Sequence, residues 1–250
     1  MHKKSYFAHY HYLTCAKRHF ILLLQTQYII HIYLARNMTQ KLPKGALFDL
    51  DGVLIDTENQ YSVFWGNIGR EYNVGYNDFA ERIKGTNLTS ILNTYFPDKA
   101  TQAEIVNRLN DFQDNMSYDL LPGVEEFIAN LESNGITMCI VTSSDDKKME
   151  TLLTKQPFLT KHFTNIITGD DVTNSKPHPE CFLKGANLLD CDITDCYVFE
   201  DSINGIKAGL ASGAKVIALS TTVSPDVIKK YNHIVIPSFE GVTIQHLSTL

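Results

Sequence analysis

Residues 46–54, Ala-Leu-Phe-Asp-Leu-Asp-Gly-Val-Leu, decide the expected fold. An apolar run leads directly into two carboxylates, Asp49 and Asp51, and Gly52 follows them. In a strand, residues two positions apart point to the same face, so both acids should project together where the strand ends. The run before them lacks alternation of apolar and polar residues, which is typical of a strand buried on both faces in a parallel sheet. Ligands of such sheets lie at the carboxyl ends of the strands, so a cation or ligand site is expected here.

The chain after residue 120 alternates between strand and helix patterns. The expected strands are 136–141, 165–168, 196–199, 216–219 and 234–236. The expected helices are 121–134, 147–153, 179–189 and 203–212. This alternation predicts an α/β fold in which a doubly wound parallel sheet carries helices on both faces.

Residues 57–119 follow a helical pattern instead. Apolar side chains recur at spacings of three and four from Tyr61 onward, and no β-rich run interrupts them. Thr57 is placed to cap the first helix, with Gln60 three residues later completing a capping box. Trp65 and its aromatic neighbours are interpreted as the core of this helical insert. The expected domains are a core, 40–56 and 120–250, and the inserted helical domain, 57–119.

Composition and charge limit the function classes. With 250 residues and 44% hydrophobic content, the chain is typical of a soluble globular protein. Residues 1–37 contain five of the 22 basic residues and no acid, so the remainder is markedly acidic. An acidic body argues against binding to nucleic acid and against stable membrane association, both of which need a basic face. We therefore expect a monomer whose partner is a small molecule.

The cysteines indicate the compartment. The chain has five, an odd number, and none forms a CxxC motif. They are interpreted as buried free thiols in a reducing compartment, so a cytoplasmic protein is expected.

The first 39 residues do not match the body. An apolar run from Phe20 to Ala35 is interrupted by polar residues and is too short for a membrane span, and no small-residue cleavage site follows it. Three interpretations stay open: a targeting segment, a weak membrane anchor, or an upstream stretch preceding a true start at Met38. We favour the last, so residues 1–37 are expected to lie outside the native chain, within an N-terminal extension that is bounded at residue 39.

Four predicted strands end in polar residues that suit one task. In chain order these residues are Asp49 and Asp51, Thr142, Lys176, and Glu200 with Asp201. Each has an ordinary explanation alone: Thr142 as a helix cap, Lys176 as a solvated lysine, and the last two acids as partners of a helix dipole. Because the carboxyl ends of parallel strands converge on one crevice, we expect the whole set to lie together.

Carboxylates with one lysine and one hydroxyl suit a phosphate held against Mg²⁺, which prefers oxygen ligands. One aspartate could attack phosphorus and the other could act as general acid and base. No cysteine or histidine cluster indicates a zinc site, and no glycine-rich nucleotide loop is present.

These motifs resemble the haloacid dehalogenase superfamily, in the subgroup of β-phosphoglucomutase and small sugar phosphatases. The resemblance covers nearly everything from Lys44 onward. The motifs are Asp49-x-Asp51-Gly52-Val53, Thr142 after an apolar strand, Lys176-Pro177-x-Pro179 and Glu200-Asp201-Ser202-x-x-Gly205. The helical insert then corresponds to the cap of that family, which closes over the site and selects the substrate.

The resemblance implies a role for each residue. Asp49 would be the nucleophile, Asp51 the general acid and base, Thr142 a phosphate ligand, and Lys176 the charge-balancing lysine. The implied Mg²⁺ ligands are Asp49, the backbone carbonyl of Asp51, and Asp201 with or without Glu200. The implied phosphate or substrate contacts are Gly52, Ser143 and Ser144 in the core and Lys84 and Asn87 in the cap.

Two departures from the mutases of this family favour a phosphatase. Mutases carry Lys-Gly-x-Ser-Arg in the cap, whereas residues 84–88 here place Leu88 at the arginine position. Mutases also carry Ser-Lys-Asn after the second strand, whereas Asp145 here replaces the lysine, and its charge would repel a second phosphate. Tyr61 also stands where many relatives have histidine. The expected function is hydrolysis of a sugar or polyol monophosphate, with a mutase or a catalytically silent regulatory protein as the alternatives.

Overall fold

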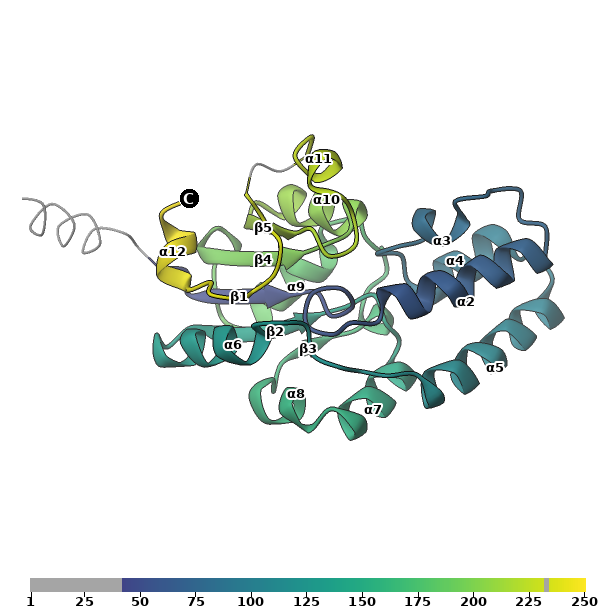
Figure 1. The fold of residues 1–250 in the computed structure, drawn as a ribbon, viewed down its shortest axis with the longest axis horizontal. Helices are drawn as coiled ribbons and strands as arrows, with labels where there is room; N and C mark the ends of the chain where they lie inside the picture. The colour runs from purple at the N-terminus through teal and green to yellow at the C-terminus, as the bar shows by residue number, and fades with distance from the viewer. Residues whose placement is uncertain (1–41, 232–233) are drawn as a thin grey trace, which may run out of the picture. The chain divides into compact units, whose positions relative to one another are not determined.

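A parallel β-sheet forms the centre of the computed structural model, which describes residues 42–231 and 234–250 (Figure 1). Its strands are β1 (Gly45–Phe48), β2 (Thr137–Val141), β3 (Ile166–Ile167), β4 (Cys196–Glu200), β5 (Lys215–Leu219) and β6 (Val235–Ile236). They lie in the order β3-β2-β1-β4-β5-β6, and every pair is parallel. The chain reverses its direction of travel across the sheet between β1 and β4, which is where ligands bind in doubly wound folds. The predicted fold class is therefore confirmed.

Strand β1 lies at the middle of the sheet, and its register aligns the strand ends. Leu47 lies opposite Cys139 of β2 and Val198 of β4, and all four residues of β1 are buried. The ladder continues past β1, since the Asp49 amide donates to the Phe199 carbonyl at 3.0 Å. The expectation of a strand buried on both faces is confirmed, and the first acid is fixed at the edge of the sheet.

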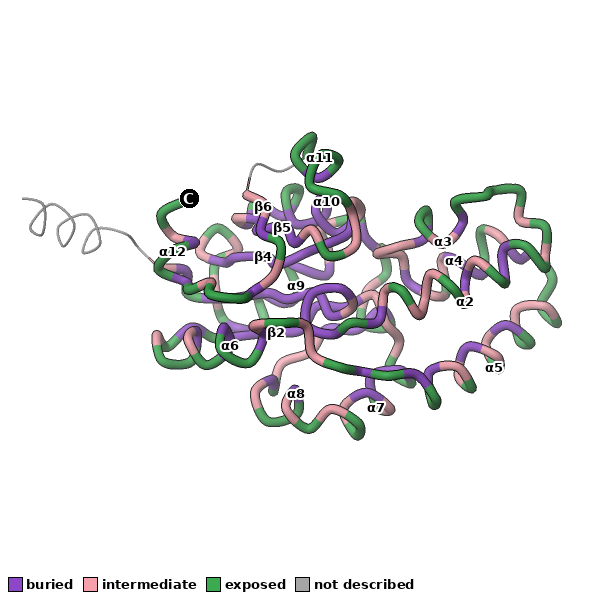
Figure 2. Tube along the Cα trace, viewed as in Figure 1, coloured by how far each residue is buried: buried purple, intermediate pink, exposed green. Residues whose placement is uncertain are grey.

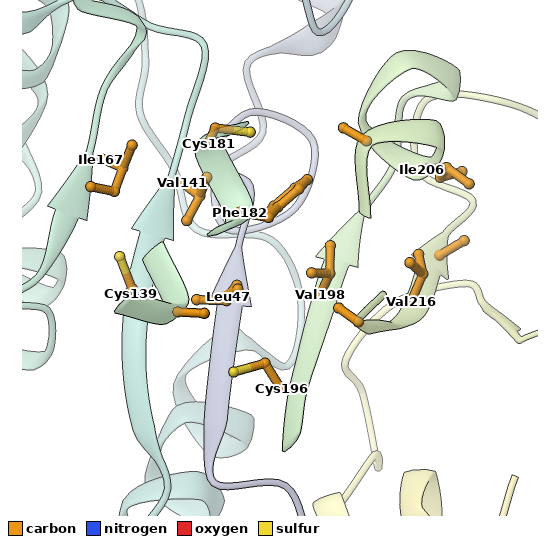
Figure 3. Close-up of a cluster of buried hydrophobic side chains, with 14 of the residues drawn as sticks. Leu47, Cys139, Val141, Ile167, Cys181, Phe182, Cys196, Val198, Ile206 and Val216 are labelled. Carbon is orange, nitrogen blue, oxygen red and sulfur yellow. The ribbon is translucent and has the colours of Figure 1, made fainter. Parts of the chain in front are cut away.

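Helices cover both faces of the sheet. On one face, α9 (Glu180–Leu188) and α10 (Ile203–Ser212) pack on an apolar cluster that includes Leu47, Val198 and Phe182 (Figure 3). On the other face, Phe127 of α6 (Val124–Ser133) joins a set of stacked and edge-on rings with Phe48. The remaining core helices are α7 (Asp146–Lys155), α8 (Pro157–His162), α11 (Pro225–Ile228) and α12 (Ile244–Ser248), with short 3₁₀ turns at Gly169–Asp171 and Ile193–Asp195. The strands are buried, whereas most helices expose an outer face (Figure 2).

The inserted helices lie between β1 and β2 in the chain and have an apolar core of their own. They are α2 (Glu58–Glu71), α3 (Phe79–Arg82), α4 (Leu88–Tyr95) and α5 (Lys99–Asn115). Trp65, Ile68, Phe79 and Leu109 are buried in one cluster, which confirms the interpretation of Trp65 as a core residue. The chain enters and leaves this insert side by side, because the Asp56 amide donates to the Asp119 carbonyl at 2.8 Å. The bounds 57–119 for the cap stay a prediction.

The capping box predicted for Thr57 and Gln60 is wrong. Helix α2 does begin after Thr57, but the Thr57 hydroxyl donates to Oδ1 of Asp51 instead of capping the helix. The Gln60 side chain donates to the Asp56 and Ser117 carbonyls at 3.2 and 3.1 Å. As a donor to a carboxylate the Thr57 hydroxyl makes a charge-assisted hydrogen bond, and its oxygen accepts none from the first amides of α2.

Cys139, Cys181 and Cys196 are buried free thiols, as predicted, whereas Cys191 is a free thiol that is only partly buried. Cys15, the interpretations of residues 1–39 and the domain bound at residue 40 all lie outside the described residues. Within the described part of the chain, no helix combines the length and the apolar character that crossing a membrane requires.

Candidate active site

The loop after β3 brings Lys176 to the end of β1. The Lys176 ammonium lies 2.5 Å from Oδ1 of Asp49 and 2.8 Å from Oε1 of Glu200, and it also donates to the Val141 carbonyl at 3.2 Å. Its side chain is 1% exposed. Burial alone would lower the pKa of Lys176, but the charges of Asp49 and Glu200 outweigh burial and raise it. Lys176 is therefore a charged ammonium inside the protein, and the predicted convergence of these strand ends is present.

Glu180 shapes the loop that carries Lys176. Its carboxylate accepts hydrogen bonds from the backbone amides of Thr173 and Asn174, both at 3.0 Å, and pairs with Lys184 at 2.9 Å. These hydrogen bonds, led by the one from Thr173, lower the pKa of Glu180 to about 2. A charged carboxylate thus fixes the loop three residues before the lysine.

Glu200 ends β4 with both carboxylate oxygens in use. Oε1 accepts from Lys176, and Oε2 accepts from the amides of Asp201 and Ser202 at 2.9 and 2.8 Å and from the Ser202 hydroxyl at 3.0 Å. A Cβ atom at Gly205 would lie 1.6 Å from Oε1, so only glycine leaves room for this carboxylate. Gly205 of the Glu200-Asp201-Ser202-x-x-Gly205 motif thus makes room for the Glu200 carboxylate.

Three buried carboxylates form a group that fits a divalent cation. Asp49, Glu200 and Asp201 each offer one oxygen, and these oxygens lie within 4.8 Å of one another. Burial raises the pKa of Asp49 and of Asp201, because each carboxylate is desolvated beside other acids. Lys176 balances one of the three charges, so a hard cation such as Mg²⁺ suits the donor set that is left. Glu200 already accepts four hydrogen bonds, which leaves Asp49 and Asp201 as the better placed direct ligands.

Gly52 forms the turn beyond the acidic pair. Its φ of +73° lies in the left-handed region, and a Cβ atom there would lie 2.1 Å from Oδ2 of Asp201. A side chain at position 52 would therefore occupy the space beside the predicted metal ligand, which explains why glycine follows the two acids.

Asp51 points into the cavity, and both of its oxygens accept hydrogen bonds. Besides Thr57, the donors are the Ser144 hydroxyl at 3.1 Å and the Lys148 ammonium, whose nitrogen lies 2.6 Å from Oδ1. Lys148 was not identified from the sequence. A signal was available, since Lys148 lies one helical turn before the buried Leu152 and so falls on the buried face of α7.

The residues after β2 form the wall next to Asp51. The Thr142 hydroxyl accepts from the Ser144 amide at 3.0 Å, and the Ser143 hydroxyl donates to the Gly85 carbonyl at 2.9 Å. Asp145 caps α7 by accepting from the Lys148 amide at 2.9 Å. The nearest lysine that lines the cavity after position 145 is Lys148, and its ammonium is paired with Asp51.

Lys84 and Asn87 have different surroundings in the cap. Lys84 lines the cavity, is 13% exposed, and pairs with Glu58 at 3.2 Å and with Glu81 at 3.0 Å. Asn87 is buried, caps α4 by accepting from the Ser90 amide, and does not line the cavity within the described chain.

A cavity of about 120 Å³ lies between the inserted helices and the core. Its polar wall includes Asp49, Asp51, Glu58, Lys84, Gln113, Thr142, Ser143, Ser144, Asp145, Lys148 and Asp201. Its apolar wall includes Trp65, Ile83, Leu88, Ile91 and Leu109. Asp49, Asp51, Asp145 and Asp201 of the core therefore face this space together with Glu58 of the inserted helices.

The family model for haloacid dehalogenase-like hydrolases matches residues 46–219. The chain belongs to this family. The match runs from the first strand to the fifth and includes the predicted nucleophile, the lysine loop and the acids after β4, so the resemblance inferred from the motifs is confirmed.

Relatives of known activity include phosphatases and a mutase. The chain is 31% identical to the bifunctional riboflavin kinase/FMN phosphatase of Arabidopsis thaliana over 73% of its own length, but it spans only 50% of that protein. It is 28% identical to hexitol phosphatase A of Escherichia coli, covering 80% of this chain and 94% of the relative. It is 30% identical to β-phosphoglucomutase of Bacillus subtilis, covering 68% and 80%.

Solved structures agree on the fold. A family IA, variant 3 hydrolase from Entamoeba histolytica superposes with a TM-score of 0.70 at 24% identity, covering 83% of this chain and all of that one. At that identity the likeness concerns the fold, which is the α/β core with an inserted cap.

Proposed function

We propose that the protein is a Mg²⁺-dependent phosphatase that hydrolyses a small sugar or polyol monophosphate through an aspartyl phosphate, an acyl phosphate formed on Asp49. One observation carries the proposal: Asp49 and Asp51 end β1 side by side at the cavity, with a buried lysine on the first and a ring of donors on the second. The first carboxylate is thus placed to attack, and the second to exchange a proton.

In the first step, an Asp49 oxygen attacks phosphorus and the bond from phosphorus to the leaving oxygen breaks. Asp51 gives its proton to that oxygen, so a neutral alcohol leaves. In the second step, water attacks the phosphorus of the aspartyl phosphate while Asp51 takes one of its protons. The bond from phosphorus to Asp49 breaks, which releases phosphate and restores the Asp49 carboxylate and the protonated Asp51.

The other residues bind and orient the phosphate. Thr142 and the Ser143 and Ser144 backbone line the wall beside Asp49, and Lys176 opposes the negative charge that builds up there. Bound Mg²⁺, held by Asp49, Asp201 and the Asp51 backbone carbonyl, would supply further charge neutralisation.

The charges of the cavity support a substrate with a single phosphate. Lys84 is paired with Glu58, and Lys148 is paired with Asp51. Asp145 and Leu88 line the cavity where a mutase would offer cations. A second phosphate would therefore meet uncompensated negative charge, whereas the hydroxyl groups of a sugar or polyol find donors and acceptors. The relative from Escherichia coli is named for activity on phosphates of this kind, as hexitol phosphatase A.

Phosphate release from a panel of phosphomonoesters tests the proposal. Purified protein with Mg²⁺ should release phosphate from at least one sugar or polyol phosphate, and EDTA or Asp49→Asn should abolish the release. Asp56→Asn is the matched control, because Asp56 is exposed at the end of the same segment, and it should keep full activity.

Two other results would overturn the proposal. Conversion of glucose 1-phosphate to glucose 6-phosphate with a bisphosphate primer and little free phosphate would identify a mutase. Inactivity across the whole panel, with or without Mg²⁺, would identify a silent regulatory protein. We further propose a monomer in the cytoplasm, which the four free thiols of the described chain support.

A further inference from the structure

Lys148 reaches Asp51 from the first turn of α7. The capping carboxylate of Asp145 holds the Lys148 amide at 2.9 Å, which sets the direction of the side chain. The ammonium then contacts both oxygens of Asp51, and the Lys148 side chain is 4% exposed. An ammonium so deep in the protein is held by a specific partner rather than by solvent.

The cap closes the other side of this lysine. The Tyr61 ring of α2 lies 4.4 Å from the Lys148 ammonium, and Gln113 of α5 donates to the Tyr61 hydroxyl at 3.2 Å. A cation over an aromatic face is attracted to it, more strongly where water is excluded. Lys148 is thus enclosed between a carboxylate of the core and a ring of the cap.

This enclosure fixes the orientation of the Asp51 carboxylate. Oδ1 accepts from Thr57 and Lys148, and Oδ2 accepts from Ser144 and Lys148. The hydroxyl groups of Thr57 and Ser144 can rotate and bind one oxygen each, whereas the ammonium bridges both. Lys148 is therefore the group that resists rotation of the carboxylate about its own axis.

We propose that Lys148 is a positioning residue that orients the Asp51 carboxylate toward the leaving oxygen of the substrate. The inference rests on the proposed phosphatase function and adds a residue to it. When the bond from phosphorus to the leaving oxygen breaks, the proton moves from Asp51 to that oxygen, and Lys148 keeps its three protons. A misplacement of about 1 Å in such a transfer can cost on the order of 100-fold in rate.

The leaving group of the substrate distinguishes positioning from general structural support. An alkoxide from glycerol 1-phosphate must be protonated as it leaves, whereas 4-nitrophenolate is stable without a proton. In a first-turnover measurement, Lys148→Met should slow alcohol release from glycerol 1-phosphate by about 100-fold, within the range typical of general acid catalysis. Release of 4-nitrophenol from 4-nitrophenyl phosphate should change less than about threefold, which also shows that the variant is folded.

Two further variants sharpen the test. Lys148→Arg keeps a cation that can bridge both oxygens. Its rate of alcohol release from glycerol 1-phosphate should therefore be at least about tenfold higher than that of Lys148→Met. Lys147→Met removes the neighbouring lysine, whose side chain is 54% exposed and pairs only loosely with Glu150 at 3.9 Å. It should behave as the wild type with both substrates.

The outcomes separate this inference from the proposed function. If the wild type acts on both substrates but Lys148→Met slows both equally, or neither, Lys148 does not position Asp51 and the inference falls alone. If the wild type hydrolyses no phosphomonoester of the whole panel, the proposed function falls and the inference falls with it. A positioning role would also be contradicted if Lys148→Arg slowed glycerol 1-phosphate relative to 4-nitrophenyl phosphate as much as Lys148→Met does.

Discussion

The ammonium group of Lys176 lies 2.8 Å from Oε1 of Glu200, and the two side chains are 1% and 0% exposed. This pair joins the loop after β3 to the end of β4, at the point where the nucleophile candidate Asp49 ends β1. The other oxygen of Glu200 is held by its own loop. Lys176 thus balances the negative charge of two buried carboxylates, Asp49 and Glu200.

Lys176→Met should lower the free energy of unfolding by about 3 to 5 kcal/mol, because it leaves Asp49 and Glu200 buried without their partner. Urea denaturation without added metal measures the change. Lys184→Met is the control, since Lys184 is 44% exposed and its pair with Glu180 should contribute less than about 1 kcal/mol. Equal losses in the two variants would contradict the dependence of the site on Lys176.

Mg²⁺ should stabilise the folded protein through the carboxylates after β1 and β4. At about 100 times the dissociation constant, a ligand specific for the folded state adds about 2.7 kcal/mol, so Mg²⁺ should raise the Tm and EDTA should reverse the rise. Asp201→Asn should remove most of this Mg²⁺ effect. Asp226→Asn, an exposed acid on α11, should keep it, and an equal rise in both variants would count against a site at Asp201.

Gly205→Ala should destabilise the protein by about 1 to 3 kcal/mol, because the new methyl group would overlap the buried Glu200 carboxylate. Gly66→Ala is the matched helical control. A Cβ atom there meets only the Arg70 guanidinium at 3.6 Å, so this change should stabilise α2 by up to about 1 kcal/mol. Chemical denaturation of both variants checks the opposite signs.

Asp145→Asn should separate the structural function of Asp145 from its charge. Asparagine still caps α7, so the stability should stay within about 0.5 kcal/mol, whereas Asp145→Ala should lose about 1 kcal/mol. Removing the charge should tighten inhibition by fructose 1,6-bisphosphate by about tenfold, because a second phosphate is then less strongly repelled. An unchanged inhibition constant would show that position 145 does not select against a second phosphate.

Glu180→Gln should lower the Tm by a few degrees at neutral pH and by progressively less in acid. The folded pKa of Glu180, about 2, is depressed below its ordinary value of 4.5. Its contribution is therefore present above the ordinary value and is lost as the pH falls toward about 2. Thermal scans at about pH 7 and pH 3 measure the difference, with Glu150→Gln, which is 79% exposed, as a control without effect.

The predicted sheet and the convergence of its strand ends needed only local patterns. Buried parallel strands appear as continuous apolar runs, and the residue after each run must lie at the same edge of the sheet. Asp49 and Thr142 follow their strands directly, and Lys176 belongs to the loop after β3. Thr57 shows the limit, because its helix start was predicted correctly while its hydroxyl bonds to Asp51, which no local pattern indicates.

By itself, the sequence determined the α/β core, the helical insert, and the acids and lysine at the strand ends, because hydrophobic periodicity and strand polarity act along the chain. Only the tertiary structure decided which charged side chains from different elements of the fold pair with one another. Lys148 meets Asp51 from 97 positions away, and Gly205 makes room for the Glu200 carboxylate. Those contacts depend on the close approach of side chains from different elements, where a few tenths of an ångström separate an ion pair from a clash.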